Sequence, residues 1–305
     1  MTSQPFYTGP GADARGRRRA RALPPAPTGS AGGAGRRLAL LTALTAALGT
    51  AFVYAPRLIA ASTPGGGFSS QRSLIEHLRD AFIGYYGSGS RTFTPDMQRI
   101  VDYWFRYHVA KAVIAALLMG VLSMLALLLW RTYLRTDLGV RGRAAIAAAW
   151  GFAATLALCS AAVVAANIHG AVVPFASLLS MLPAAEPDAR FTTTLEQVKQ
   201  GLAHYPNAAG HTSPALREMV DDFALFHAVL AVIALVVALA LIGMSVVAWR
   251  RFARAKDDRQ ARHAFAVFGV ASIAASLAVI VVAVANLTTV AAPAPALLAF
   301  FQGGW

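Results

Sequence analysis

Five long runs of apolar residues, separated by short polar segments, dominate this chain of 305 residues. Each run has about 20 residues or more, the length at which a helix crosses the ~30 Å apolar core of a bilayer. The runs do not alternate apolar and polar residues, as the strands of a membrane barrel do. They span residues 38–61, 108–130, 144–166, 223–249 and 264–287. The pattern therefore predicts an all-α, polytopic membrane protein with five transmembrane helices.

An internal repeat runs through the last four apolar segments. Residues of distinctive chemistry recur 119 positions later in unbroken register, which coincidence in an apolar chain does not explain. The matched pairs include Pro95 and Pro214, Asp102 and Asp221, His108 and His227, Trp130 and Trp249, Asn167 and Asn286, and Pro174 and Pro293. Each copy is expected to hold an amphipathic helix followed by a transmembrane hairpin.

The amphipathic helix of each copy is predicted by apolar residues at helical spacing. These are Ile75, Leu78, Phe82 and Tyr85 in the first copy, and Leu195, Val198, Leu202 and Tyr205 in the second. Ser73 with Glu76, and Thr193 with Glu196, have the spacing of capping boxes at the helix starts. Prolines 95 and 214 each follow a hydroxyl residue and so predict the first turn of the next helix.

These signals divide the chain into four parts. Residues 1–37 are a basic tail expected to be disordered and cytoplasmic, and 38–61 are a signal-anchor. An alternative for the start is a cleaved twin-arginine export signal around Arg36 and Arg37. Residues 69–182 and 192–301 are the two repeats, which we expect to be related by an axis along the membrane normal. Two hairpins can then close into a 2+2 four-helix bundle.

The distribution of charge predicts the orientation. The net charge is +13, but the segments 1–37, 131–143 and 250–263 hold 17 Lys and Arg against four Asp and Glu. The segments 62–107 and 170–222 hold eight Lys and Arg against ten Asp and Glu. An excess of Lys and Arg marks the cytoplasmic side, so we expect a plasma-membrane protein with its N-terminus inside and its C-terminus outside. The basic balance is thus a signal of topology, and nucleic acid is not an expected partner.

Two His and Asn pairs are the first candidates for chemistry. Counting from the hairpin loops places His108 at the depth of Asn167, and His227 at the depth of Asn286. In the first interpretation, each imidazole bonds to the amide across its hairpin and holds the register of the two helices. In the second, His108 and His227 converge on the repeat axis and ligate a haem iron, copper or zinc.

Three ionisable residues complete the set of candidate ligand-binding residues. Asp102 has Arg99 and Arg106 at helical pairing distance, and Asp221 has Arg217, so interfacial ion pairs are expected. Lys111 lies just inside a span, where Leu230 stands in the second repeat. It either extends its ammonium to the headgroups or binds an anion, because charges within spans are candidates for functional sites.

The short stretch 166–174, the twin-arginine-like start and the Ala- and Arg-rich composition resemble uncharacterised multi-pass membrane proteins of actinobacteria. The resemblance implies no activity. Phosphate-binding loops and the common hydrolase and zinc-protease motifs do not occur in the sequence.

The residues favour a non-enzymatic binding module that presents a small helical cap on the outer face. Its expected partners are the lipid bilayer and, at the cap, a protein or an amphipathic small molecule. One alternative is a small transporter or an export or immunity accessory. The other is a metal- or haem-dependent redox protein that uses His108 and His227.

Overall fold

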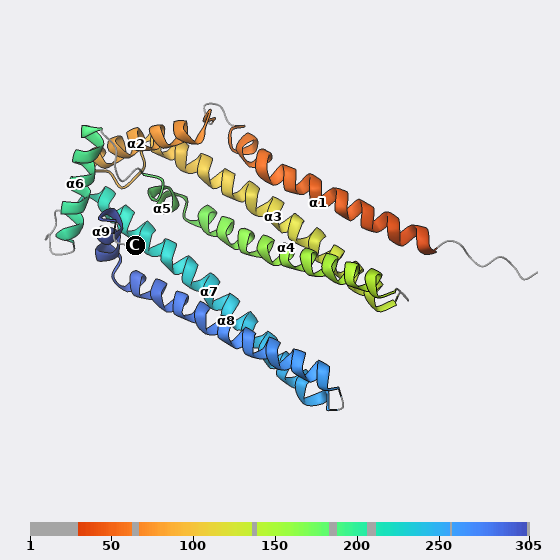
Figure 1. The fold of residues 1–305 in the computed structure, drawn as a ribbon. Coiled ribbons are helices and arrows are strands. Elements are labelled where there is room, and N and C mark those ends of the chain that lie inside the picture. Colours follow the sequence, from red (N-terminus) through yellow and green to blue (C-terminus); the bar gives the residue numbers. More distant parts are fainter. Residues whose placement is uncertain are drawn as a thin grey trace, which may run out of the picture.

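The structure is a computed structural model that describes residues 30–62, 67–135, 139–182, 188–205, 212–256 and 258–303. Over these ranges the regular structure is entirely helical, which confirms the all-α class (Figure 1). In chain order the helices are α1 (Ser30–Ala60), α2 (Gln71–Ser88), α3 (Pro95–Arg135), α4 (Val140–Val172), α5 (Pro174–Leu179), α6 (Ala189–Ala203), α7 (Pro214–Arg254), α8 (Arg259–Ala291) and α9 (Pro293–Phe301).

The helix bounds follow the repeat in the sequence. Helices α3 and α7 each have 41 residues, α4 and α8 each have 33, and their first and last residues are offset by the same 119 positions. Both α3 and α7 begin at the expected prolines, Pro95 and Pro214. The short helices α5 and α9 also begin at prolines of the repeat, Pro174 and Pro293. Proline suits the first helical turn because its missing N–H would have no partner there. The same local signals thus produce the same elements twice.

Five helices are long and apolar enough to cross a membrane, as the sequence predicted: α1, α3, α4, α7 and α8. Many of their large apolar side chains are exposed, among them Val113, Leu239 and Val281. Exposed apolar surface on this scale is stable when lipid covers it. The protein is therefore a multi-pass membrane protein whose helices contact lipid. Helix α1 begins at Ser30, before the expected start of the first span at residue 38, and residues 1–29 of the basic tail lie outside the described residues.

All the short helices gather at one end of the molecule, opposite the arginine-bearing ends where α3 and α7 finish and α4 and α8 begin (Figure 1). We call this assembly the cap; it consists of α2, α5, α6, α9 and the first turns of α3 and α7. Its interior is a continuous hydrophobic core whose largest fully buried side chains include Phe82, Tyr85, Phe175, Phe191, Met219 and Leu297. Each large apolar side chain buried in this way contributes about 1.5–3 kcal/mol.

The amphipathic faces predicted for the first and second repeats form the inside of this core. Leu78, Phe82 and Tyr85 of α2 are buried, and so are Val198 and Leu202 of α6. The face from Ile75 to Tyr85 is therefore not the surface that the cap presents.

The predicted capping boxes are wrong in position. Helix α2 is capped by Ser70, whose side chain accepts a hydrogen bond from the N–H of Ser73. Helix α6 is capped by Asp188, which accepts from the N–H groups of Arg190 and Phe191. A capping residue needs an extended backbone outside the helix, and Ser73 and Thr193 already lie within helical turns.

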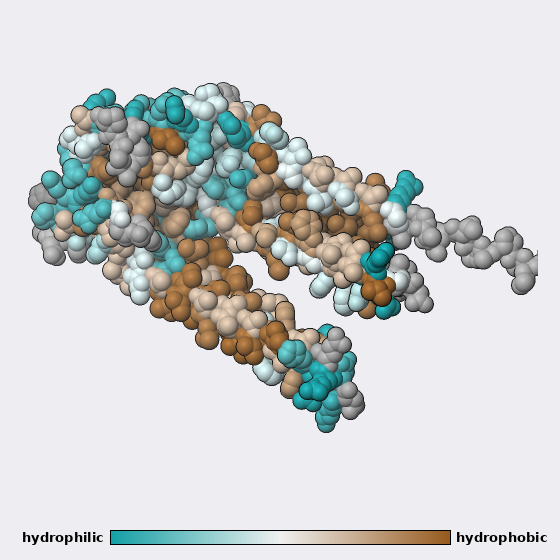
Figure 2. Space-filling view, viewed as in Figure 1, coloured by the Kyte–Doolittle hydropathy of each residue, from teal (hydrophilic) through white to brown (hydrophobic). Residues whose placement is uncertain are grey.

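The two hairpins separate from each other away from the cap. Helices α3 and α4 pack along their length, as do α7 and α8, and α1 packs on α3. Between the hairpins, the described helices make their main contact where α4 meets α7, near the cap. Figure 2 shows an open wedge with apolar walls beyond that point. The closed 2+2 bundle expected from the sequence is therefore corrected to two hairpins joined by the cap, because lipid solvates apolar helix faces as well as another helix does.

Candidate functional site

Each hairpin contains a hydrogen bond between its histidine and its asparagine. His108 Nδ1 lies 3.0 Å from Asn167 Oδ1, joining α3 to α4. His227 Nδ1 lies 2.7 Å from Asn286 Oδ1, joining α7 to α8. Asn167, His227 and Asn286 are buried. The structure thus brings together the partners that counting along the helices had placed at one depth.

The second polar group of each asparagine decides which imidazole nitrogen carries the proton. Asn167 donates through Nδ2 to the carbonyl of Val163 at 2.7 Å, and Asn286 donates to the carbonyl of Val282 at 2.8 Å. The amide oxygen is therefore the atom left to face the histidine, and it can only accept. Each neutral imidazole must donate through Nδ1, which leaves the lone pair on Nε2.

The surroundings of His108 are specialised for close packing. A Cβ placed on Gly170 of α4 would lie 2.7–2.9 Å from three atoms of the His108 ring, so the glycine makes room for the imidazole. The Trp104 ring packs edge-on against the imidazole, with 4.7 Å between the two ring centres. Trp104 Nε1 donates to Ser177 Oγ of α5 at 2.7 Å. His108 Nε2 is buried and has no hydrogen-bond partner among the described residues. The pair is therefore both a link between helices and a buried acceptor.

A third histidine, which the sequence reasoning did not select, connects the two hairpins. His169 of α4 is buried and donates through Nε2 to the carbonyl of Phe226 on α7 at 2.9 Å. Its ring also lies 4.0 Å from the Phe226 ring. The second repeat has Thr288 at the matching position. This break in the repeat was the available signal, because a contact between two copies need not be symmetric.

The two aspartates of the repeat have different partners from those expected. Asp102 accepts from Gln98 Nε2 at 2.8 Å, whereas Arg99 pairs with Asp96. Asp221 pairs with Arg91, which precedes α3, at 2.9 Å.

Arg91 is a second residue that the sequence reasoning missed. It also bonds Glu218 of α7 at 2.7 Å, and its carbonyl accepts from the hydroxyl of Tyr85 at 3.2 Å. Burial raises the pKa of Tyr85 above its usual range, so the phenol remains a neutral donor. The segment before α3 is thus tied to both α2 and α7 within the cap.

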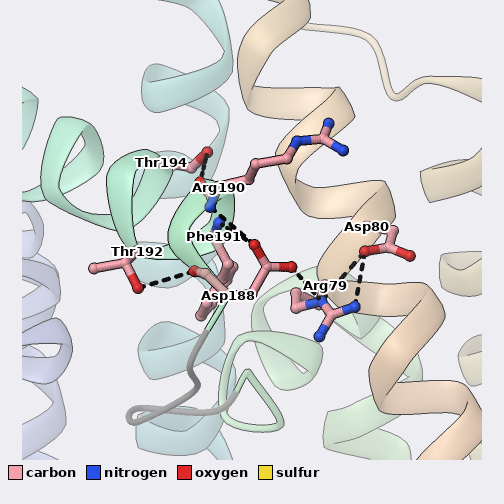
Figure 3. A network of polar contacts seen from close by, with 7 residues as sticks. All are labelled: Arg79, Asp80, Asp188, Arg190, Phe191, Thr192 and Thr194. Carbon is pink, nitrogen blue, oxygen red and sulfur yellow. Dashed lines mark hydrogen bonds and ion pairs between the residues drawn. The ribbon is translucent and has the colours of Figure 1, made fainter.

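A polar network joins the two amphipathic helices, as Figure 3 shows. Arg79 of α2 bonds Asp80 at 3.1 Å, and its Nε lies 3.5 Å from Asp188, the residue that caps α6. The N–H of Phe191, followed by the N–H of Arg190 and the charge of Arg79, holds the pKa of Asp188 below its ordinary value. The carboxylate therefore stabilises both the start of α6 and the contact between α2 and α6.

Lys111 lies at the boundary between α1 and α3. Its ammonium is 4.8 Å from the centre of the Phe52 ring on α1 and 5.1 Å from the centre of the Tyr107 ring. A cation held against aromatic faces is attracted by their negative charge density. The structure thus places Lys111 against aromatic rings of α1 and α3.

Among the residues that the structure describes, no three His, Cys, Asp or Glu side chains group as metal ligands. The site at His108 and His227 involves only two ligands, and it stays a prediction. Comparisons with models of known protein families, with curated proteins and with solved structures found no match to this chain.

Proposed function

We propose that this protein is a non-enzymatic membrane binding module that holds its cap on the extracytoplasmic face. The observation that carries the proposal is the cap itself, a folded body outside the spans with its own hydrophobic core. The polar side chains within the spans support it further, since His169, Asn167 and Asn286 all connect helices. Side chains that form these hydrogen bonds position the helices. We therefore assign the binding of a partner to the cap.

The outward faces of α2 and α6 are the surface that a partner would meet. Their exposed side chains are polar and carry both signs of charge: Arg72, Glu76, His77, Asp80, Arg190, Glu196, Gln197 and Gln200. Such a surface matches the polar surface of another protein better than it matches an amphipathic small molecule, whose apolar part would need an apolar patch. A protein partner on the extracytoplasmic side is therefore the better-supported occupant.

Site-specific photo-crosslinking in intact cells tests this proposal. A photoreactive amino acid replaces Gln197 or Glu76 on the outward faces, and Leu134 at the basic end of α3 serves as an exposed control. We expect one discrete protein adduct from both cap positions and none from the control. Equal adducts at all three positions, or none at any of them, would count against a partner bound at the cap.

Cysteine labelling tests the orientation on which the proposal depends. The chain has one native cysteine, Cys159, in the middle of α4, and a Cys159→Ala background removes it. In that background, Gln197→Cys is expected to react with a membrane-impermeant maleimide in whole cells, whereas Arg250→Cys is expected to react only after lysis. The reverse pattern would place the cap in the cytoplasm and refute the assigned side.

One observation favours a second candidate function, a metal- or haem-dependent redox protein. A histidine that donates through Nδ1 to a carbonyl oxygen has the protonation in which proteins bind a metal through Nε2. His108 and His227 both have this arrangement with their asparagines. Metal analysis of the purified protein, described in the Discussion, separates this candidate from the binding module.

A further inference from the structure

A small polar cavity opens between α1, α2 and α3 at the cap end of the first hairpin. Its volume is about 200 Å³, and its lining residues are Arg57, Ser70, Gln71, Leu74, Tyr103, Trp104, Tyr107 and Met181. The lining holds a cation, three aromatic rings and the first turn of a helix, and none of these residues is a carboxylate. The first turn of a helix carries partial positive charge, so the cavity favours an anion.

Two cations lie near this cavity: Arg57 lines it, and Lys111 lies just below it. Arg57 donates through one guanidinium nitrogen to the carbonyl of Ser69 at 3.0 Å and also hydrogen-bonds with the side chain of Tyr103, which fixes its position. A guanidinium has five N–H donors, so it can still donate to a bound anion. Lys111 lies one helical turn beyond Tyr107, with its ammonium against the Tyr107 and Phe52 rings. Both cations therefore lie near Tyr107, since Arg57 lines the same cavity as this residue and Lys111 contacts its ring.

An apolar groove lies further along the same helices. Its volume is about 270 Å³, and its lining includes Phe52 and Gly49 of α1, Ala115 and Leu122 of α3, and Val163 of α4. Tyr107, Lys111 and Ala115 follow at intervals of four residues, so the cavity, the ammonium and the groove lie on one face of α3. A Cβ on Gly49 would meet no atom within 4 Å, which shows that the groove is open beside it.

We propose that this face binds one anionic phospholipid, with its phosphate between Arg57 and Lys111 and an acyl chain in the groove. A polar cavity lined by one cation, with a second cation one helical turn deeper and an apolar groove further along the same helices, matches the two parts of such a lipid. The aromatic rings suit the level of the headgroups, where Tyr and Trp are enriched.

The repeat supplies a further reason. The second hairpin keeps the proline, aspartate, histidine, tryptophan and asparagine of the first, but it has Leu230 in place of Lys111. No described helix packs on α7 as α1 packs on α3. A lysine is therefore not needed to build the hairpin, and the site belongs to the first repeat alone.

Native mass spectrometry of the full chain in detergent tests whether the two cations recognise an anionic headgroup. Phosphatidylglycerol and phosphatidylcholine with the same acyl chains are added in turn, and the lipid adducts are counted. We expect tighter binding of phosphatidylglycerol, and a loss of about fivefold in its affinity for each of Lys111→Leu and Arg57→Gln. The control Arg190→Gln, on α6, is expected to bind as the unmodified protein does. Equal binding of the two lipids, or equal loss in the control, would overturn the proposal.

Gly49→Leu tests the groove, because it fills the open space while leaving both cations in place. The same change at Gly120 of α3, whose surroundings are also open and which lines neither cavity, is the matched control. We expect Gly49→Leu to weaken phosphatidylglycerol binding and Gly120→Leu to leave it unchanged. Free glycerophosphate is expected to bind poorly; if it competes as well as the lipid, the site takes a free phosphate and the groove has no role. These readouts require no protein partner, so their outcome is independent of the proposed function.

Discussion

The hydrogen bond between His227 and Asn286 offers the sharpest test of how the hairpins are held together. We consider the variants His227→Phe and Asn286→Leu, singly and together, because these side chains keep the volume while removing the polar atoms. Asn286→Leu alone leaves the Nδ1–H of His227 buried without its asparagine, and an unsatisfied buried donor costs about 1–3 kcal/mol. The double variant has neither polar group, so it should lose less free energy of unfolding than the sum of the two single variants.

The difference between that sum and the double variant is the coupling energy of the pair. Hydrogen bonds between helices in membranes average about 0.6 kcal/mol, with a maximum near 1.7 kcal/mol. The 2.7 Å distance and the burial of both residues place this pair in the upper part of that range, at about 1 kcal/mol. The pair between His108 and Asn167 is longer, at 3.0 Å, and His108 is only half-buried, so its coupling should be smaller.

Unfolding in mixed micelles of increasing dodecyl sulfate content measures these energies, with tryptophan fluorescence as the signal. Trp249 is a suitable reporter for the second hairpin, because its ring packs against Gly269 of α8. A coupling energy within about 0.3 kcal/mol of zero in both hairpins would refute the reasoning, since the bonds would then make no net contribution. A larger coupling in the first hairpin would contradict the ranking by distance and burial.

Three further predictions concern packing, capping and metal. Gly170→Ala should destabilise the first hairpin by about 1–3 kcal/mol, because the new methyl group overlaps the His108 ring, whereas Gly120→Ala, in open space, should not destabilise it; equal effects in the same micelle assay would contradict this. The pKa of Asp188 is lowered in the folded protein, so its contribution is present above the pKa of the unfolded carboxyl and is lost as the pH falls. Lowering the pH from about 6 to about 3 should therefore lower the midpoint temperature of unfolding less in Asp188→Ala than in the unmodified protein. Identical pH profiles of the two proteins would refute that role. We expect the purified protein to show no Soret band and no stoichiometric metal, because the described residues hold no group of three side chains that could ligate a metal; a band or metal that disappears in the His108→Ala/His227→Ala variant would replace the binding module with the redox alternative.

Much of the candidate site was predictable because it depends on counting along straight helices. A helix rises a constant 1.5 Å per residue, so the distance from the hairpin loop sets the depth of His108 and Asn167 in advance. The repeat then gives the same expectation for His227 and Asn286. Arg91 was not predictable in this way, because its partners Glu218 and Asp221 lie more than 120 residues away. Their proximity arises only when the cap brings the two repeats together.

Local signals in the sequence specify the helices of this protein, because apolar length, fixed spacing and proline placement act within a few helical turns. They specify the five spans, the bounds shared by α3 and α7, and the common depth of each histidine and its asparagine. Which of the helix surfaces become buried depends on the packed fold. The faces of α2 and α6 are buried in a common core, and the hairpins separate because lipid covers their apolar sides as well as another helix would. Periodicity shows that a helix face is apolar, and only the packed fold decides whether protein or lipid covers it.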